Sequence, residues 1–217
     1  MDNAVNAILA ARLLAVIRLD RYDSAVEVAQ ALLAGGISIL EFTLTGEGAY
    51  AAIAAVRAAL GGAVTVGVGT VLHGGEASRA VDAGAQFAVT PAVRPGVIAA
   101  CQARGLPILC GAFTPTEALA AHEAGADLIK IFPARALGPQ YIRDLLAPLP
   151  QLRLVPTGGL GPENLGAYLE AGAAAVAVGG NLVPRSAAER GDWAQITAQA
   201  RACVAALPAV QARRARP

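Results

Sequence analysis

Lys130 is the only lysine in this chain of 217 residues, and it lies in the apolar segment DLIKIFP at 127–133. Burial of an amine among apolar side chains disfavours its charged form and lowers its pKa from an ordinary value of roughly 10.4. A neutral amine is a nucleophile, so Lys130 is a candidate for Schiff-base formation with a carbonyl substrate. The structural alternative is a lysine at a strand end whose amine reaches solvent or pairs with a carboxylate.

Glu41 is the second candidate for chemistry, because its carboxylate stands between Leu40 and Phe42 in another apolar segment. A buried carboxylate is costly unless it is paired or protonated, and such a group can serve as a general acid or base. Its structural alternative is an ion pair with Arg18 or Lys130, which can also be the resting state of a catalytic pair. Arg18 can instead grip the carboxylate of a substrate through two hydrogen bonds.

Two Gly-Gly pairs, at 158–159 and 179–180, are the third signal, and each pair follows a short apolar segment. Adjacent glycines leave backbone N–H groups open to an anion. Either pair taken singly is more typical of a tight turn. Two pairs after the last two strands of a barrel favour a phosphate site, because barrels often bind phosphate there.

The elements that position these residues follow a recurring pattern, in which a helix-like stretch ends at glycine and a short apolar segment begins a few residues later. Glycine closes a helix in the left-handed conformation, and a continuous apolar run suits a strand covered on both faces. Further breaks at Gly61-Gly62, at Gly105 and at 148–150 each precede another apolar segment, and one more such segment stands at 13–19. Strands are therefore predicted at residues 13–19, 37–44, 64–71, 87–91, 106–113, 128–132, 152–157 and 175–178. Eight such units predict an α/β fold, a (β/α)8 TIM barrel whose active site lies at the carboxyl ends of the strands.

A doubly wound open sheet is the main alternative fold. It would require a glycine-rich dinucleotide fingerprint after an early strand. Gly67 and Gly69 lie within a predicted strand and lack the third, spaced glycine of that fingerprint. The barrel is therefore favoured.

We expect one barrel domain over residues 1–207 and a basic tail over 208–217, whose arginines precede the final proline. An extra helix is predicted at 2–12, where it can close the bottom of the barrel. A single long helix is predicted at 187–207.

Composition and charge exclude several classes of protein. The net charge is +1 with acidic and basic residues mixed, so no nucleic-acid surface is expected. Charged residues, glycine and proline interrupt the apolar stretches, which argues against a membrane span. Asp2 and the lack of basic residues before the apolar segment argue against a signal peptide at 4–14. Cys101, Cys110 and Cys203 show no metal-ligand spacing, and their odd number fits a reducing cytoplasm. Neither histidine lies at an expected strand end, so a zinc site or a Ser-His-Asp triad is poorly supported.

Six short motifs, in order between about 14 and 184, together resemble one family, the 2-keto-3-deoxy-6-phosphogluconate (KDPG) and 2-keto-4-hydroxyglutarate (KHG) aldolases. The motifs are EFTLT at 41–45, GVGTV at 67–71, VTP at 89–91, IKIFP at 129–133, GPQYI at 138–142 and PTGG at 156–159. Several distinct motifs in the right order are more specific than any one of them.

The resemblance implies a metal-independent class I aldolase without cofactor, a (β/α)8 barrel that is commonly a homotrimer. It implies cleavage of 2-dehydro-3-deoxy-6-phosphogluconate to pyruvate and glyceraldehyde 3-phosphate, with 4-hydroxy-2-oxoglutarate as a further substrate. Lys130 would form the imine with the keto acid, and Glu41 would be the general acid and base. The implied substrate-binding residues are Thr70, Pro91 and Phe132 around pyruvate, Thr157 on the sugar chain, and Gly158, Gly159, Gly179, Gly180 and Asn181 on the phosphate.

Two positions depart from the family pattern. Some members carry an arginine four residues after the catalytic glutamate, where this chain has Thr45, whereas others carry it at the end of the first strand, as Arg18 does here. The substrate carboxylate is therefore assigned to Arg18. Arg135 stands where a smaller or acidic residue is expected, and the sequence offers no role for it.

The same residues are compatible with other activities. Phosphogalactonate aldolases share the arginine of the first strand and the GPQYI segment, while Pro156 and Thr157 favour the gluconate type. A phosphate-binding isomerase or epimerase could use Glu41 as base with Lys130 as its electrophilic partner. A barrel that serves only as a binding scaffold would leave Lys130 at an ordinary high pKa.

Overall fold

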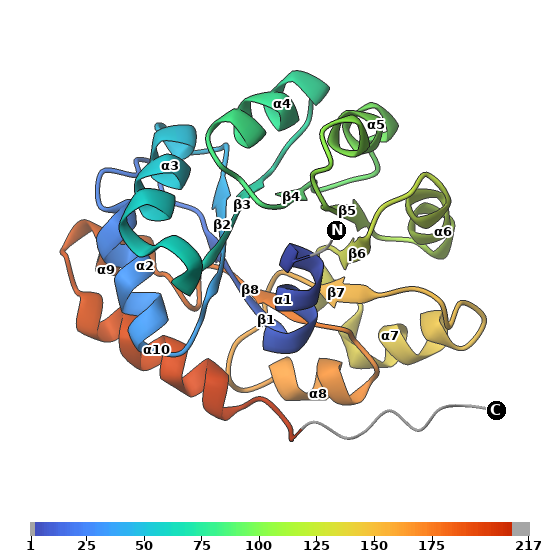
Figure 1. Cartoon of the computed structure of the whole chain (residues 1–217). Helices are drawn as coiled ribbons and strands as arrows, with labels where there is room; N and C mark the ends of the chain where they lie inside the picture. Colours follow the sequence, from blue (N-terminus) through green and yellow to red (C-terminus); the bar gives the residue numbers. More distant parts are fainter. Residues whose placement is uncertain (1–2, 210–217) are drawn as a thin grey trace.

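The computed structural model describes residues 3–209, in which parallel strands form a central barrel with helices around it (Figure 1). The strands are β1 Leu13–Ile17, β2 Ile39–Thr43, β3 Thr65–Gly69, β4 Ala88–Val89, β5 Ile108–Ala112, β6 Leu128–Ile131, β7 Leu154–Pro156 and β8 Val176–Val178. The helices are α1 Asn3–Ala11, α2 Ala25–Ala34, α3 Ala49–Leu60, α4 Gly74–Asp82, α5 Pro95–Ala103, α6 Pro115–Glu123, α7 Gly138–Leu146, α8 Leu165–Glu170, α9 Arg185–Glu189 and α10 Trp193–Ala205. Two short 3-10 helices, η1 Gly61–Ala63 and η2 Ala134–Ala136, complete the regular structure. Over the same residues, we find no helix with the length and hydropathy to span a bilayer.

The strands are hydrogen-bonded in the order β7-β6-β5-β4-β3-β2-β1-β8, and the two end strands meet. Between β7 and β8, the N–H of Ala174 donates to the carbonyl of Leu154 at 2.9 Å, and Thr157 forms a parallel bridge with Ala177. The predicted (β/α)8 barrel is confirmed, and the alternative prediction of an open doubly wound sheet is wrong. Every observed strand lies within its predicted range.

Helix α1 closes the amino-terminal end of the barrel, as predicted. Figure 1 shows α1 in front of the strands and inside the ring of outer helices. Its Ala4, Val5 and Ile8 belong to the same buried cluster as Leu14 and Leu128, which stand near the starts of β1 and β6. The bottom of the barrel is thus filled with apolar side chains.

Alternation along the strands brings polar side chains to the other end of this interior. Side chains two residues apart in a strand share one face. Ile39 and Leu128 belong to the interior cluster, so Glu41 and Lys130 follow them on the same face. Both side chains therefore point into the barrel near the carboxyl ends of their strands.

Glycines in β3 and β5 leave room inside the barrel for larger groups. A side chain at Gly67 would collide with the ring of Phe87, and one at Gly111 would collide with the backbone of Pro91. Gly111 stands beside Lys130 in the strand register. The small residues thus allow bulky neighbours to pack close to the lysine.

The single long helix predicted at 187–207 is wrong, because the chain forms α9 and α10 there instead. Gly191 separates them in the left-handed conformation, with φ of 68°. Asp192 then caps α10 by accepting a hydrogen bond from the N–H of Gln195 at 3.0 Å. A glycine followed by an N-cap residue is a helix stop and a helix start, which ends one helix and begins the next. The terminal arginines of the predicted tail lie outside the described residues.

Tyr22 joins the carboxyl ends of β1 and β2, beside the predicted site. Its buried hydroxyl lies 3.0 Å from the carbonyl of Ile17 and 2.8 Å from that of Thr43, and it accepts the N–H of Thr43 at 3.1 Å. The ring packs edge-on against Phe42, with centroids 5.5 Å apart. One side chain thus satisfies polar groups from two strand ends.

We predict that Tyr22→Phe lowers the free energy of unfolding by about 1 to 2 kcal/mol, because buried backbone groups lose their partner. Urea denaturation followed by circular dichroism measures the loss. Tyr50→Phe is the matched control, since the Tyr50 hydroxyl has only a 3.5 Å contact to a carbonyl on a half-exposed surface. Equal midpoints for Tyr22→Phe and the wild type would contradict the prediction.

Candidate active site

Lys130 and Glu41 form a buried pair inside the barrel. The lysine Nζ lies 3.9 Å from Oε1 of Glu41, and the two side chains are 5% and 1% exposed. Sequence reasoning left open whether Glu41 would pair with Arg18 or with Lys130. The structure shows the ion pair with Lys130.

The Glu41 carboxyl group is seated against β3 and largely shielded from solvent. A side chain at Gly69 would collide with it, so the glycine provides its space. Within residues 3–209, Oε1 has no hydrogen-bond partner, which leaves this oxygen directed at the lysine amine and open to a proton or a substrate group. Burial raises the pKa of Glu41, while the charges of Lys130 and Arg18 partly lower it.

The Lys130 amine is held in surroundings that favour its neutral form. Burial lowers the pKa of Lys130, the positive charge of Arg18 lowers it further, and Glu41 opposes both effects. The amine also lies over the ring of Phe132, 5.3 Å from the ring centre. Because desolvation is the largest cause, the barrel interior itself favours the nucleophilic form.

A cavity of about 490 Å³ opens beside this pair at the carboxyl ends of β1, β6, β7 and β8. Most of the predicted substrate-binding residues line it, namely Arg18, Phe132, Thr157, Gly158, Gly159, Gly179, Gly180 and Asn181. Lys130 and Glu41 are not among the lining residues. The Lys130 amine lies 5.3 Å from the ring centre of the lining residue Phe132, and Glu41 is the strand neighbour of the lining residue Val16. Residues from both halves of the sequence thus converge on one space.

Both Gly-Gly pairs line this cavity, as predicted for an anion site. Gly158 and Gly159 are left-handed, with φ of 96° and 79°. A side chain at Gly158 would crowd the Phe132 ring, whereas the space at Gly180 is open. Backbone of this kind can approach an anion closely from two sides.

Two of the predicted binding side chains are already hydrogen-bonded within the protein. The amide of Asn181 donates to the carbonyl of Leu160 at 3.0 Å, which ties the loop after β8 to the loop after β7. The Thr157 hydroxyl donates to the carbonyl of Val155 at 3.2 Å. Asn181 therefore fixes the relative position of the two glycine loops as well as lining the cavity.

Thr70 and Pro91 are not among the cavity-lining residues. Thr70 follows the glycine that faces Glu41 and is one of the few non-glycine residues with positive φ, at 59°. Pro91 packs its backbone against Gly111, the strand neighbour of Lys130. Both residues therefore stand one step from the buried pair, on the side away from the glycine loops.

Six lining residues were not assigned a role from the sequence, namely Val16, Pro133, Arg135, Leu160, Val183 and Arg185. Arg135 and Arg185 line the cavity, and Arg185 forms an exposed ion pair with Asp20 at 2.9 Å. Leu160 also contributes to the lining. Arg185 lies several residues beyond its strand, so alternation along the strand carried no signal for it.

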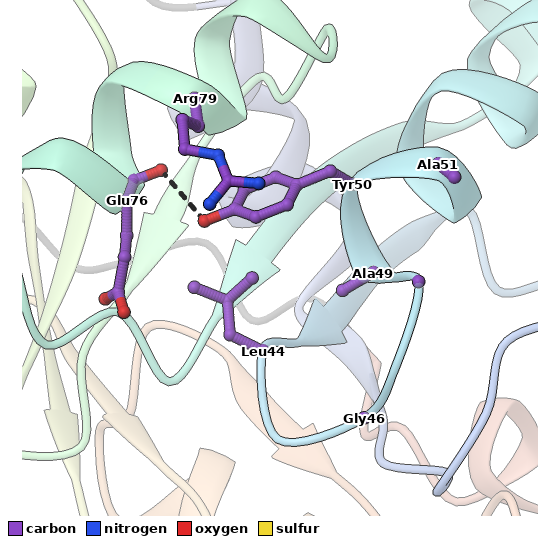
Figure 2. Close-up of a pocket in the computed structure, with 8 residues that line it drawn as sticks. Leu44, Gly46, Ala49, Tyr50, Ala51, Glu76 and Arg79 are labelled. Carbon is purple, nitrogen blue, oxygen red and sulfur yellow. Dashed lines mark hydrogen bonds between the residues drawn. The ribbon is translucent and has the colours of Figure 1, made fainter.

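A second hollow lies between the loop after β2 and helix α4, and Figure 2 shows its residues. The guanidinium of Arg79 stacks on the ring of Tyr50, 4.5 Å from its centre. Glu76 accepts hydrogen bonds from the N–H groups of Leu72 and His73, so it caps α4. The charged groups of this second hollow, Glu76 and Arg79, are thus engaged in local contacts, and Lys130 is not among its lining residues. Across residues 3–209, no three His, Cys, Asp or Glu side chains gather as a metal site would require.

We predict opposite shifts in the pKa of Lys130 when its two charged neighbours are removed. Arg18→Ala removes a positive charge and raises this pKa, whereas Glu41→Gln removes a negative charge and lowers it. NMR titration of protein carrying isotope-labelled lysine reports on this one side chain. Arg153→Ala, which removes an exposed arginine before β7, serves as the control, and shifts of the same sign in both test variants would contradict the prediction.

The fold and the buried amine beside a carboxyl group fit an aldolase of the (β/α)8 barrel class, which is a lyase, and comparison with known proteins shows that class. The chain belongs to the KDPG and KHG aldolase family, whose sequence pattern it matches over residues 5–199. This agrees with the resemblance found in the short motifs.

Three known proteins illustrate the similarity. The chain is 41% identical to the 2-dehydro-3-deoxy-phosphogluconate aldolase of Treponema pallidum, over 86% of this chain and 89% of that protein. It is 36% identical to the 2-dehydro-3-deoxy-6-phosphogalactonate aldolase of Escherichia coli, over 78% of this chain and 83% of that one. The solved KDPG aldolase of Legionella pneumophila, with pyruvate captured at low pH as a covalent carbinolamine, superposes with a TM-score of 0.81 at 30% identity, over 91% of this chain and 96% of that one.

Proposed function

We propose that this protein is a class I aldolase that cleaves 2-dehydro-3-deoxy-6-phosphogluconate to pyruvate and glyceraldehyde 3-phosphate. The observation that carries the proposal is the buried pair of Lys130 and Glu41 beside a cavity that two Gly-Gly pairs line. The gluconate-type and carbinolamine-forming relatives support it. The same centre would cleave 4-hydroxy-2-oxoglutarate to pyruvate and glyoxylate, because that substrate shares the 2-keto-4-hydroxy acid unit.

In the proposed reaction, the neutral amine of Lys130 attacks the C2 carbonyl of the keto acid to give a carbinolamine. Loss of water then leaves a protonated imine. The C4 hydroxyl gives up its proton as the bond between C3 and C4 breaks, and the electron pair passes to the imine nitrogen as an enamine. Glu41 carries the protons in these steps, because its buried carboxyl group lies 3.9 Å from the amine and burial raises its pKa. Protonation of the enamine at C3 and hydrolysis of the imine release pyruvate.

The remaining site residues would bind the two ends of the substrate. Arg18 lines the cavity, and its charge acts on both Lys130 and Glu41. It is therefore placed to bind the carboxylate of the substrate, which is attached to C2. The pyruvate unit would contact Thr70, Pro91 and Phe132, and Thr157 would face the sugar chain. The phosphate would lie against Gly158, Gly159, Gly179, Gly180 and Asn181, where backbone N–H groups can reach it.

The galactonate epimer is the second candidate substrate, supported by the similarity to the phosphogalactonate aldolase. The two keto acids differ only in configuration at C4, the carbon that carries the broken bond. Cleavage assays with both epimers in parallel decide between them, and a higher kcat/KM for the galactonate compound would reverse our assignment.

We propose a cytoplasmic homotrimer as the working form. All three cysteines are buried and unpaired, which suits a reducing compartment. Leu72 and Phe113 are the exposed large hydrophobic side chains of residues 3–209, at 39% and 40% exposure, and both follow strands at the carboxyl face. In a trimer, an interface between subunits would cover both side chains.

We predict that borohydride reduction in the presence of pyruvate attaches one reduced adduct to Lys130, because only an imine is trapped. Intact mass followed by peptide mapping locates it, and the single lysine leaves the α-amine as the one other candidate. Lys130→Met should fold with an unchanged circular dichroism spectrum, gain no adduct and lose activity by several orders of magnitude. Ordinary turnover by Lys130→Met would rule out the imine.

A separate prediction concerns Glu41→Gln, which keeps the shape of the side chain but cannot take up a proton. Exchange of the pyruvate methyl protons with deuterated solvent should slow about 100-fold or more, because general acid and base catalysis is lost. The pyruvate concentration that half-saturates borohydride trapping should change much less. Equal losses in exchange and in binding would indicate a structural carboxylate instead.

A further inference from the structure

All charged side chains that line the cavity are arginines. Arg18, Arg135 and Arg185 come from three different segments, and no aspartate or glutamate lines the same space. Such a site attracts anions, and a substrate with two separate anionic groups can satisfy more than one arginine. Arg18 is already proposed to bind the substrate carboxylate. Arg135 and Arg185 are therefore the candidates for binding the phosphate at the other end of the substrate.

The two arginines near the far end differ in what they contact. Arg185 is engaged with Asp20 through the exposed ion pair at 2.9 Å. Arg135 forms no ion pair and no side-chain hydrogen bond with any of residues 3–209. Its positive charge is therefore uncommitted at the edge of the cavity.

The loop after β7 holds Arg135 directly beside the first glycine pair. The backbone N–H of Arg135 donates to the carbonyl of Gly158 at 3.0 Å. Its Cβ, Cγ and Cδ atoms cover Gly159, where any side chain would collide with them. The stem of the arginine is thus packed on the glycine that would face the phosphate, and only the guanidinium remains free to reach a ligand.

We infer that Arg135 determines specificity for phosphorylated substrates, by binding the phosphate that the two glycine pairs cradle. This inference rests on the proposed function and deepens it. Backbone N–H groups alone offer hydrogen bonds without net charge, whereas a guanidinium adds a full positive charge and a fork of donors that matches two phosphate oxygens. The preference for phosphorylated keto acids over 4-hydroxy-2-oxoglutarate would then come from this side chain.

The test compares Arg135→Ala, Arg135→Lys and the wild type with the phosphorylated keto acid and with 4-hydroxy-2-oxoglutarate. For Arg135→Ala, KM for the phosphorylated substrate should rise about tenfold, the size of one charge-assisted hydrogen bond. Its kcat, and both constants for 4-hydroxy-2-oxoglutarate, should stay close to those of the wild type. The KM of Arg135→Lys for the phosphorylated substrate should lie between those of Arg135→Ala and the wild type, because lysine keeps the positive charge but lacks the forked pair of donors. Arg153→Ala is the control, since it removes an equal charge at the opposite end of the barrel.

Direct binding of inorganic phosphate, measured by calorimetry, provides a readout that does not depend on turnover. Phosphate should bind more weakly to Arg135→Ala than to the wild type or to Arg153→Ala. Equal phosphate binding by all three proteins, or equal losses of kcat/KM for both substrates, would overturn the role of Arg135. If the wild type cleaves neither substrate but Arg135→Ala still binds phosphate more weakly, the proposed aldolase activity fails and the anion contact stands.

Discussion

The close approach of an amine and a carboxyl group within a sealed protein interior is the constraint around which this barrel is built. Neither Lys130 nor Glu41 retains useful contact with solvent, and each is the other's nearest charged partner at 3.9 Å. In water the amine would be protonated and inert, and the carboxylate would hold no proton to give. The pair therefore becomes chemically useful only because the surrounding strands exclude water. Its desolvation must be offset by apolar packing elsewhere in the core.

The distribution of side chains inside the barrel follows from that constraint. Apolar groups from α1 and the starts of the strands fill the lower part, which keeps water from reaching the pair from below. Glycines stand where the strands pass the reactive groups, and the carboxyl group of Glu41 occupies the space left by Gly69. A side chain of any size at that position would displace Glu41 from the lysine. Small residues are thus as necessary to the site as the two charged ones.

Much of this arrangement follows from the sequence, because it depends on local rules. Apolar runs bounded by glycine or proline locate the strands, and the position of Lys130 and Glu41 in two of these runs predicts that both are buried near strand ends. The two glycine pairs could be assigned to one space because the last two strands of a barrel are neighbours. The split between α9 and α10 is not in the prediction, although Gly191 and Asp192 signal it within the non-apolar run at 189–192.

Other features depend on distances in space that no local pattern contains. Arg185 reaches the cavity from the first residue of α9, several residues beyond β8, and Asn181 uses its amide to join two loops. The choice of Lys130 over Arg18 as the partner of Glu41 depends on side-chain geometry across the barrel. Arg135 could be seen as unusual from the sequence, but its packing on Gly159 is visible only in the folded chain.

The apolar plug formed by α1 also has a consequence for the order in which substrates and products would enter and leave the proposed site. With the lower end filled by apolar side chains, the cavity beside the glycine loops lies at the opposite, carboxyl-terminal end of the barrel. In the proposed reaction, a substrate would enter from that end with its keto end leading and its phosphate end trailing. After cleavage, the aldehyde would stand between the covalently held pyruvate unit and the solvent. The aldehyde would then depart first, and in the reverse direction pyruvate would arrive before the aldehyde does.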